Sequence, residues 1–220
     1  MFTFKIKVTA MYKYSDELIR GFSYRGYPLM RDKGPFVRSY LDKIIDVMNS
    51  SINDHSRTFA FRVDLKLPKD FELLSKDRLI DRFISSFKSK IDHARRRARR
   101  DNKYAHRSSV RYVWAREEVQ TGRPHYHFVF FLNHDAFNVI GKYEQGRPNT
   151  FNRLIEAWAA ALGITAEEVL GLVHLPKNAT YLITERDLGS QDALFERASY
   201  LAKDATKVRG SRHCFGGSRR

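Results

Sequence analysis

The apolar run at residues 126–132 constrains the fold of this chain more than any other segment. Its sequence is Tyr-His-Phe-Val-Phe-Phe-Leu, so apolar side chains occupy both sets of alternating positions. Successive side chains of a strand point to opposite faces, and a strand that is apolar on both faces belongs in the interior of a sheet. The run therefore predicts a central strand.

Neighbouring segments supply partners for this strand. Residues 58–67 alternate apolar and polar side chains, which predicts a half-buried strand that ends at Pro68. A strand at 110–119 leads through the turn residues 120–123 into the central strand, so that the two form a hairpin. A short strand is expected at 171–175. Helical spacing of apolar residues predicts helices at about 35–48, 75–100, 149–162 and 190–207.

This order of elements predicts the fold class. A hairpin at the centre of strands that alternate with helices indicates an α+β domain with a mainly antiparallel central sheet, a βαββαβ-like core and helices on one face. Residues 1–34 are poorly patterned, and we expect one domain over residues 35–220.

The charge of the chain indicates its kind of partner. Lys and Arg number 40 against 25 Asp and Glu, a formal net charge of +15. This excess is larger than solubility requires and predicts a polyanionic partner, with nucleic acid as the first candidate. The alternative is a protein that is merely basic. No apolar run reaches about 18 residues, and the lone Cys214 excludes an internal disulfide, so we expect no membrane contact and a cytoplasmic location.

His125 and His127 are candidate metal ligands. In a strand, alternate residues share one face about 7 Å apart, from where both imidazoles could bind one cation. The alternative is a pair of histidines in ordinary hydrogen bonds. Glu117 and Glu118 end the preceding strand, so hairpin pairing brings a carboxylate beside the imidazoles. Two imidazoles and one carboxylate leave coordination positions open, which suits Mg²⁺ or Mn²⁺ holding a phosphate oxygen.

The register of the hairpin decides which glutamate faces the histidines. A two-residue turn at 121–122 would pair position 118 with position 125 and favour Glu118, whereas a longer or bulged turn would favour Glu117. Spacing alone leaves both possibilities open.

Tyr200 is a candidate nucleophile. Arg197, Tyr200, Lys203 and Lys207 recur three or four residues apart and so form one stripe of the last predicted helix. A phenol is a poor nucleophile near neutral pH, and neighbouring cations favour its phenolate. The alternative is a tyrosine at the edge of the core. Together with the histidine pair, the stripe predicts a tyrosine that attacks a phosphodiester, with Arg197 and Lys207 binding DNA.

The densest run of charge consists of arginines: Arg95, Arg96, Arg97, Arg99 and Arg100. Such runs are often solvated helix ends, where Arg interacts favourably with the helix dipole. Beside a nuclease-like motif we expect them to contact the DNA backbone. Contacts by all of them with a single strand would give a log–log salt slope of about −3.5.

Three segments together resemble the HUH endonucleases, which comprise rolling-circle replication initiators and relaxases. The segments are 56–58 leading to 64–68, then 114–117 leading to 125–127, then 198–203. More narrowly, they are similar to inovirus-type replication proteins and to the prophage-encoded YagK/YfjJ family. The resemblance runs from about residue 35 through the closing segment 215–219.

The resemblance implies an HUH-type fold and a metal-dependent enzyme that nicks and joins single-stranded DNA. Tyr200 would attack the phosphate, leaving a 5′-phosphotyrosine link and a free 3′-hydroxyl for a polymerase. The acidic ligand of the family directly follows Trp-x-Arg, which maps to Glu117. Lys203 would orient the phosphate or neutralise charge. The implied setting is a replication origin of a filamentous phage or prophage, with the helicase and polymerase of the bacterial host.

Two rival functions remain open at this stage. A relaxase or transposase would use the same chemistry on other DNA. A non-catalytic regulator would keep the fold and bind DNA without cutting it, although the joint presence of His125, His127, Tyr200 and Lys203 favours an enzyme.

Overall fold

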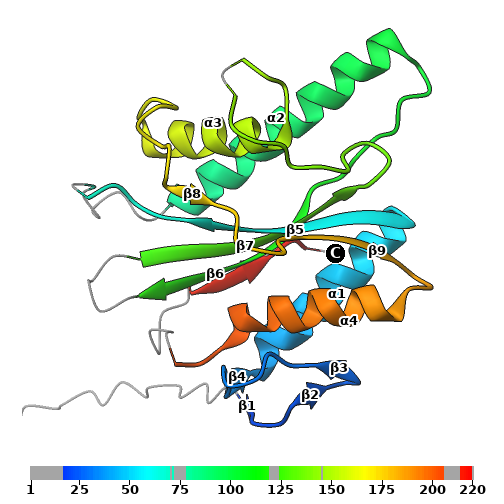
Figure 1. The fold of residues 1–220 in the computed structure, drawn as a ribbon, viewed down its shortest axis with the longest axis vertical. Coiled ribbons are helices and arrows are strands. Elements are labelled where there is room, and N and C mark those ends of the chain that lie inside the picture. The colour runs from blue at the N-terminus through cyan, green and yellow to red at the C-terminus, as the bar shows by residue number, and fades with distance from the viewer. Residues whose placement is uncertain are drawn as a thin grey trace, which may run out of the picture.

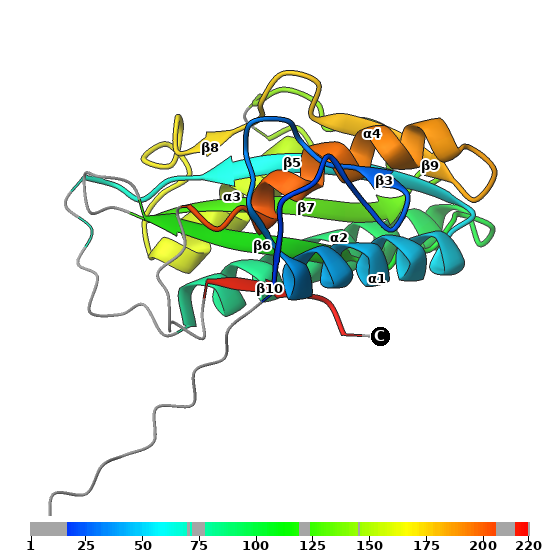
Figure 2. The same ribbon diagram turned by 90° about the horizontal axis from the view of Figure 1, so that it is seen from below.

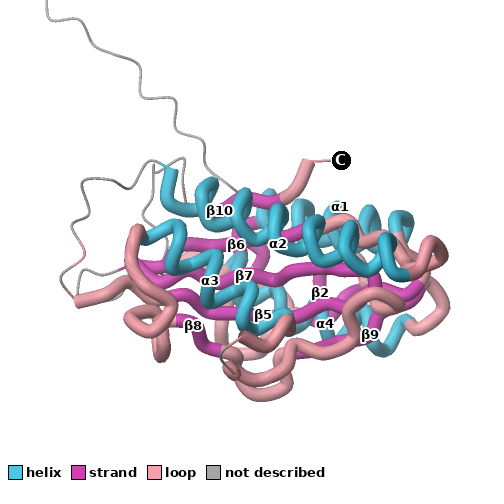
Figure 3. The backbone as a smooth tube through the Cα atoms, turned by 90° about the horizontal axis from the view of Figure 1, so that it is seen from above, coloured by secondary structure: helices cyan, strands magenta, loops and turns pink. Residues whose placement is uncertain are grey.

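The structure, a computed structural model, describes residues 17–69, 71, 78–118, 124–144, 146–205 and 214–219. These residues form three layers, in which one sheet lies between two layers of helices (Figure 1). Helices α2 and α3 cover one face (Figure 3), and helices α1 and α4 cover the other (Figure 2).

The central sheet has six strands, and every pairing in it is antiparallel. Its strands run in the spatial order β10-β6-β7-β5-β8, with β9 also paired to β5. The strands are β5 (Arg57–Leu65), β6 (Arg111–Glu118), β7 (Pro124–Asn133), β8 (Val173–His174), β9 (Thr180–Thr184) and β10 (Phe215–Gly217). The apolar strand β7 therefore lies in the interior of the sheet, as its sequence predicts, and the α+β class with a mainly antiparallel sheet is confirmed.

Four helices are described, and each buries an apolar stripe on the sheet. They are α1 (Arg38–Asp54), α2 (Leu79–Asp101), α3 (Thr150–Leu162) and α4 (Leu188–Ser199), the last of which continues into a 3₁₀ turn, η2 (Tyr200–Ala202). The predicted start of α2 near Ser75 and the turn at 120–123 lie outside the described residues.

The prediction that helices cover one face of the sheet is wrong. One core lies between the sheet and α2 and α3, and it includes Phe128 and Phe130 of β7. A second core lies under α1 and α4, and it includes Val129 and Phe131 of the same strand. A strand with apolar side chains on both faces exposes one set to water unless helices cover both faces, which is the physical reason for the second layer.

An N-terminal segment folds against the end of α4. It contains the short strands β1 (Leu18–Ile19), β2 (Ser23–Tyr24), β3 (Tyr27–Pro28) and β4 (Phe36–Val37). The Met30 amide donates to the Ser199 hydroxyl at 3.0 Å, and the Asp204 amide donates to the Pro35 carbonyl at 2.9 Å. Phe36 also forms a β-bridge with Lys203. Met30 therefore holds the chain just before Tyr200, and Pro35 and Phe36 hold the chain just after it.

None of the helices in the described ranges combines the length with the apolar character that crossing a membrane requires.

The aromatic cluster around Phe83 should carry much of the fold's stability. Phe83 is fully buried on α2, with Phe128 and Trp158 as edge-to-face neighbours at centroid distances of 5.2 and 5.5 Å. We expect Phe83→Ala to lower the free energy of unfolding by about 3–5 kcal/mol, because it leaves a cavity in a close-packed core. Chemical denaturation measures the change. Phe22→Ala, at a side chain 77% exposed, is the control and should change it by less than about 0.5 kcal/mol.

Candidate active site

The candidate site lies on the face of the sheet that α1 and α4 cover, where β5, β6 and β7 meet the end of α4. Asp64 of β5 pairs in register with His127 of β7, and Glu117 of β6 pairs with His125. Paired residues of neighbouring strands point to the same face, so these side chains gather on one side. The register places Glu117 opposite His125, and this selects Glu117 over Glu118.

His127 is held at both ring nitrogens. Its Nδ1 lies 2.6 Å from Asp64 Oδ1, and its Nε2 lies 3.2 Å from Glu117 Oε2. The residue is only 6% exposed, so both contacts form away from bulk water. Three adjacent strands thus contribute one hydrogen-bonded row of Asp64, His127 and Glu117.

The contacts in this row shift the pKa values of His127 and Asp64. Burial lowers the pKa of His127, but hydrogen bonds to Asp64 and Glu117 outweigh burial, so the pKa lies above its ordinary value. Burial raises the pKa of Asp64, but its contacts with His127 and Arg62 outweigh burial and leave the pKa below its ordinary value. Burial and the neighbouring His127 lower the pKa of His125, which keeps that half-buried ring neutral near pH 7.

Tyr200 and Lys203 join the same cluster from the end of α4. The Lys203 ammonium donates to the Tyr200 hydroxyl oxygen at 2.6 Å and lies 3.1 Å from Glu117 Oε1. The Tyr200 hydroxyl in turn lies 3.4 Å from Glu117 Oε2 as a donor. Lys203 is 9% exposed, so its charge is balanced by Glu117 in a largely dry setting.

The local backbone differs from the predicted helix over 190–207. The α-helix ends at Ser199, a 3₁₀ turn carries Tyr200, and Lys203 is extended and bridged to Phe36. A 3₁₀ turn has three residues per turn, so positions 200 and 203 still lie on one side. The spacing predicted the contact between the two side chains, whereas the bridge to Phe36 ends the helix.

Sequence reasoning missed Arg62. Its guanidinium carbon lies 4.6 Å from the centre of the Tyr200 ring, and its Nε donates to Asp64 Oδ1 at 3.0 Å. Its side chain is buried, with Nη2 3.2 Å from His127 Nδ1. The available signal was the pair Arg62 and Asp64 at alternate positions of one strand, which repeats the spacing of His125 and His127. Asp64 contacts the candidate ligand His127 directly.

Over the described residues, no group of three His, Cys, Asp or Glu side chains is arranged to hold a metal ion as it stands. The chemistry of the donor set nevertheless fits a divalent cation. The Nδ1 atom of His127 is hydrogen-bonded to Asp64 and so cannot bind a metal. The Nε2 atom, which points toward Glu117, is the ring nitrogen that can. A carboxylate behind a ligating histidine is the usual support of metal sites. His125, His127 and Glu117 are the residues that would hold such a cation.

The predicted DNA-binding residues are not gathered around Tyr200. The arginine run at 95–100 occupies the last turns of α2, on the opposite face of the sheet (Figure 1). Arg197 is half-buried in the last turn of α4 and donates to the Lys177 carbonyl at 3.0 Å. Lys207 lies outside the described residues.

We expect Asp64→Asn to lower the pKa of His127, because the substitution removes the strongest interaction that favours the charged ring. Titration of the His127 ring protons by NMR measures the shift. In the parent protein the folded pKa lies above the ordinary 6.5, so protonated His127 stabilises the fold fully below that pH. This contribution is lost as the pH rises through the folded pKa, and the variant should show a smaller loss.

Asp135→Asn is the matched control for this titration. Asp135 lies just after β7 and contacts Arg57 at 2.5 Å, away from His127. An unchanged His127 titration in Asp64→Asn would contradict the assignment of this hydrogen bond.

The chain was compared with known proteins. Residues 21–218 match the YagK/YfjJ C-terminal domain family. The chain is 33% identical to "Uncharacterized protein YfjJ" of Escherichia coli (strain K12) over 190 residues, covering 80% of this chain and 91% of YfjJ. It is 30% identical to "Uncharacterized protein YagK" of the same organism, covering 80% and 90%.

A solved structure, the N-terminal nuclease domain of minute virus of mice non-structural protein-1, is 10% identical with a TM-score of 0.23. That likeness covers 80% of this chain and 78% of the viral chain, and its TM-score is too low to carry an argument about fold or activity. The family match over residues 21–218 and the two relatives, YfjJ and YagK, point to the same family. The chain belongs to the YagK/YfjJ C-terminal domain family.

Proposed function

We propose that this protein nicks and rejoins single-stranded DNA, with Tyr200 as nucleophile and a divalent metal held by His125, His127 and Glu117. One observation carries the proposal: the Tyr200 hydroxyl contacts Lys203 at 2.6 Å and Glu117 at 3.4 Å, and the Glu117 carboxylate contacts His127 at 3.2 Å. A phenol, a cation and a candidate metal ligand set therefore share one site.

The contacts of Tyr200 suit nucleophilic attack on phosphorus. The phenol proton points to the Glu117 carboxylate, which can accept it, and the Lys203 ammonium stabilises negative charge on the phenol oxygen. The phenol oxygen then forms a bond to phosphorus, and the bond from phosphorus to the 3′ oxygen breaks. That oxygen takes up a proton from water and leaves as a 3′-hydroxyl, Glu117 gives its proton back to water, and Tyr200 carries the 5′-phosphate. The reverse reaction rejoins the strand.

Arg62 and Asp64 are positioning residues in this scheme. The Arg62 guanidinium lies over the Tyr200 ring and limits its rotation, and Asp64 holds the His127 ring in one orientation. Since Asp64 contacts both Arg62 and His127, it couples the direction of the tyrosine to that of the histidine. Such fixed geometry is what in-line attack requires.

When bound, a divalent cation would polarise the scissile phosphate as a Lewis acid. The ligand types, imidazole and carboxylate, suit Mn²⁺ well and Mg²⁺ acceptably. The net charge of +15 supports a polyanionic substrate.

The biological setting belongs to the same proposal and rests on the resemblance to HUH endonucleases. Cutting at an origin would leave the 3′-hydroxyl for a host polymerase, with a host helicase opening the duplex, and so start rolling-circle replication of a phage or prophage. A regulator that keeps the fold without cutting is the rival from another class. The full set of His125, His127, Glu117, Tyr200 and Lys203 favours the enzyme.

A covalent adduct tests the proposal. Incubated with a randomised pool of single-stranded oligonucleotides and Mn²⁺, the protein should form a DNA-linked species that mass spectrometry locates at Tyr200. We expect Tyr200→Phe to abolish the adduct, because it removes the nucleophilic oxygen, while leaving DNA binding within about twofold, since the ring and its contact with Arg62 remain.

Tyr112→Phe is the matched control for the adduct. Tyr112 lies on β6 and packs with the core on the opposite face of the sheet. The adduct should form normally in this variant. Tight binding by the parent protein without any adduct would favour the regulator instead.

Metal binding provides a second test. We expect His127→Ala to abolish Mn²⁺ binding, as followed by electron paramagnetic resonance of free Mn²⁺, because it removes one ligand. Asp64→Asn should weaken the affinity by about 10–100-fold, since only the support of that ligand is lost. His134→Ala, just beyond the end of β7 that lies away from His127, is the control and should bind like the parent. If His127→Ala bound Mn²⁺ with the same affinity as the parent protein, the assignment of His127 as a ligand would be wrong.

A further inference from the structure

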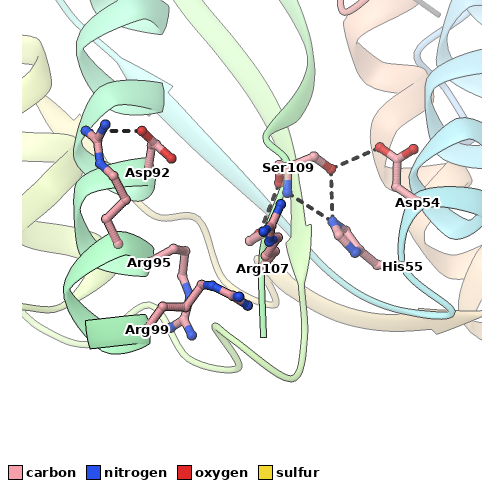
Figure 4. A pocket seen from close by; sticks show the side chains of 9 residues that line it. Asp54, His55, Asp92, Arg95, Arg99, Arg107 and Ser109 are labelled. Atoms are coloured by element: carbon pink, nitrogen blue, oxygen red, sulfur yellow. Dashed lines mark hydrogen bonds and ion pairs between the residues drawn. The ribbon is translucent and has the colours of Figure 1, made fainter. Parts of the chain in front are cut away.

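A basic pocket lies at the opposite end of the sheet from Tyr200. Its cavity volume is about 580 Å³, and it opens between the C-terminal ends of α1 and α2 and the loop before β6 (Figure 4). It is lined by Asp54, His55, Asp92, Arg95, Arg96, Arg99, Arg107, Ser108 and Ser109.

The carboxylates that line the pocket are engaged by cations. Arg111 donates to Asp54 at 2.6 Å and, with Ser109, holds the pKa of that carboxyl below its ordinary value, although burial opposes this. Asp92 pairs with Arg96 at 3.2 Å, but both side chains are more than 60% exposed. An exposed pair of this kind is worth little, so Arg96 can exchange its partner for another anion.

Other arginines of the pocket are held by neutral groups. Arg95 Nε donates to the His106 carbonyl at 2.7 Å, and Arg99 Nη1 donates to the Ala105 carbonyl at 3.2 Å. Carbonyl oxygens orient a guanidinium without cancelling its charge, and each guanidinium keeps further N–H donors. Burial and, to a smaller extent, the nearby Arg99 lower the pKa of Arg95.

The lining selects the class of ligand. Several guanidinium groups around one concave surface match the oxygens of phosphate groups. Among the described residues that line the pocket, no Phe, Tyr or Trp offers a ring for base stacking. The contacts therefore suit a sugar–phosphate backbone and carry no information about base sequence.

The separation of the pocket from the candidate active site sets the size of a shared ligand. Asp64 at the site lies nine residues along the chain from His55 at the pocket, and most of this stretch is extended, so the two are roughly 30 Å apart at about 3.3 Å per residue. One molecule that contacts both must span at least about nine base pairs at 3.4 Å each.

We propose that this pocket binds phosphate groups of a nucleic-acid backbone and holds the DNA at a second point, remote from Tyr200. This inference rests on the proposed function for the identity of the polyanion. The arginine run of α2 falls into two groups with respect to the pocket. Arg95, Arg96 and Arg99 line it, whereas Arg97 and Arg100 do not.

The division supplies a matched experiment. Arg96→Gln/Arg99→Gln removes two pocket arginines, and Arg97→Gln/Arg100→Gln removes two others with the same spacing on the same helix. Both are made in the Tyr200→Phe background and tested in EDTA, so that cleavage plays no part. Fluorescence anisotropy measures binding to labelled single-stranded and duplex DNA of about 30 nucleotides, long enough to span both sites.

We expect the pocket variant to lose affinity on the order of tenfold and its log–log salt slope to shrink by about 1.8 on duplex or 1.4 on single strands. The control variant should lose clearly less. Arg96→Lys/Arg99→Lys keeps the charge and should restore most of the affinity, which separates lost phosphate contacts from misfolding. The probe with the larger loss identifies whether the pocket holds duplex or single strand.

Equal losses in the two glutamine variants would overturn the proposal, because general charge on α2 would then explain the binding. No loss in either would overturn it as well. Failure of the parent protein to form an adduct at Tyr200 would defeat the proposed function and leave this binding result standing.

Discussion

The arrangement of this protein depends on one buried row of charges that crosses three strands and ends at Lys203, just after the 3₁₀ turn. Asp64, His127, Glu117 and Lys203 follow one another at 2.6, 3.2 and 3.1 Å. Each group would be costly to bury alone, because an unpaired charge loses its hydration. The row is tolerated because every member has a partner of opposite charge. Removing one member would leave the charge of its neighbour buried without a partner. Because the members come from three strands and from the chain after α4, their pairing also requires one strand register and one position of that helix.

The N-terminal segment helps to position the last member of this row, Lys203. Lys203 reaches Glu117 only because the chain leaves α4 at Ser199 and runs extended, bridged to Phe36 and fixed by the bond from Asp204 to Pro35. Two residues just before α1 thereby help to determine where the cation beside Tyr200 lies. The sheet then separates this site from the arginines of α2, so a DNA molecule that contacts both must pass around an end of the sheet (Figures 1 and 2).

Much of this could be predicted from local patterns. Strict alternation located β5, although both faces of that strand are buried and not one as predicted. The run at 126–132 identified the central strand, because burial on both faces leaves apolar residues at successive positions. The spacing of His125 and His127 predicted their common face for the same reason. Arg62 was missed because a charged residue on the polar face of a half-buried strand resembles a solvated one. Only the end of α4 over that face turns it into a buried contact of Tyr200.

The sequence by itself determined the class of the fold, the central strand and the residue types able to act on a phosphodiester, since periodicity and side-chain chemistry are local properties. Tertiary structure alone decided that Glu117 rather than Glu118 faces the histidines, that helices cover both faces, and that Tyr200 lies beside His127. Those outcomes depend on hairpin register and on how helices dock, and both are fixed by packing between segments far apart in the chain. No local pattern carries that information.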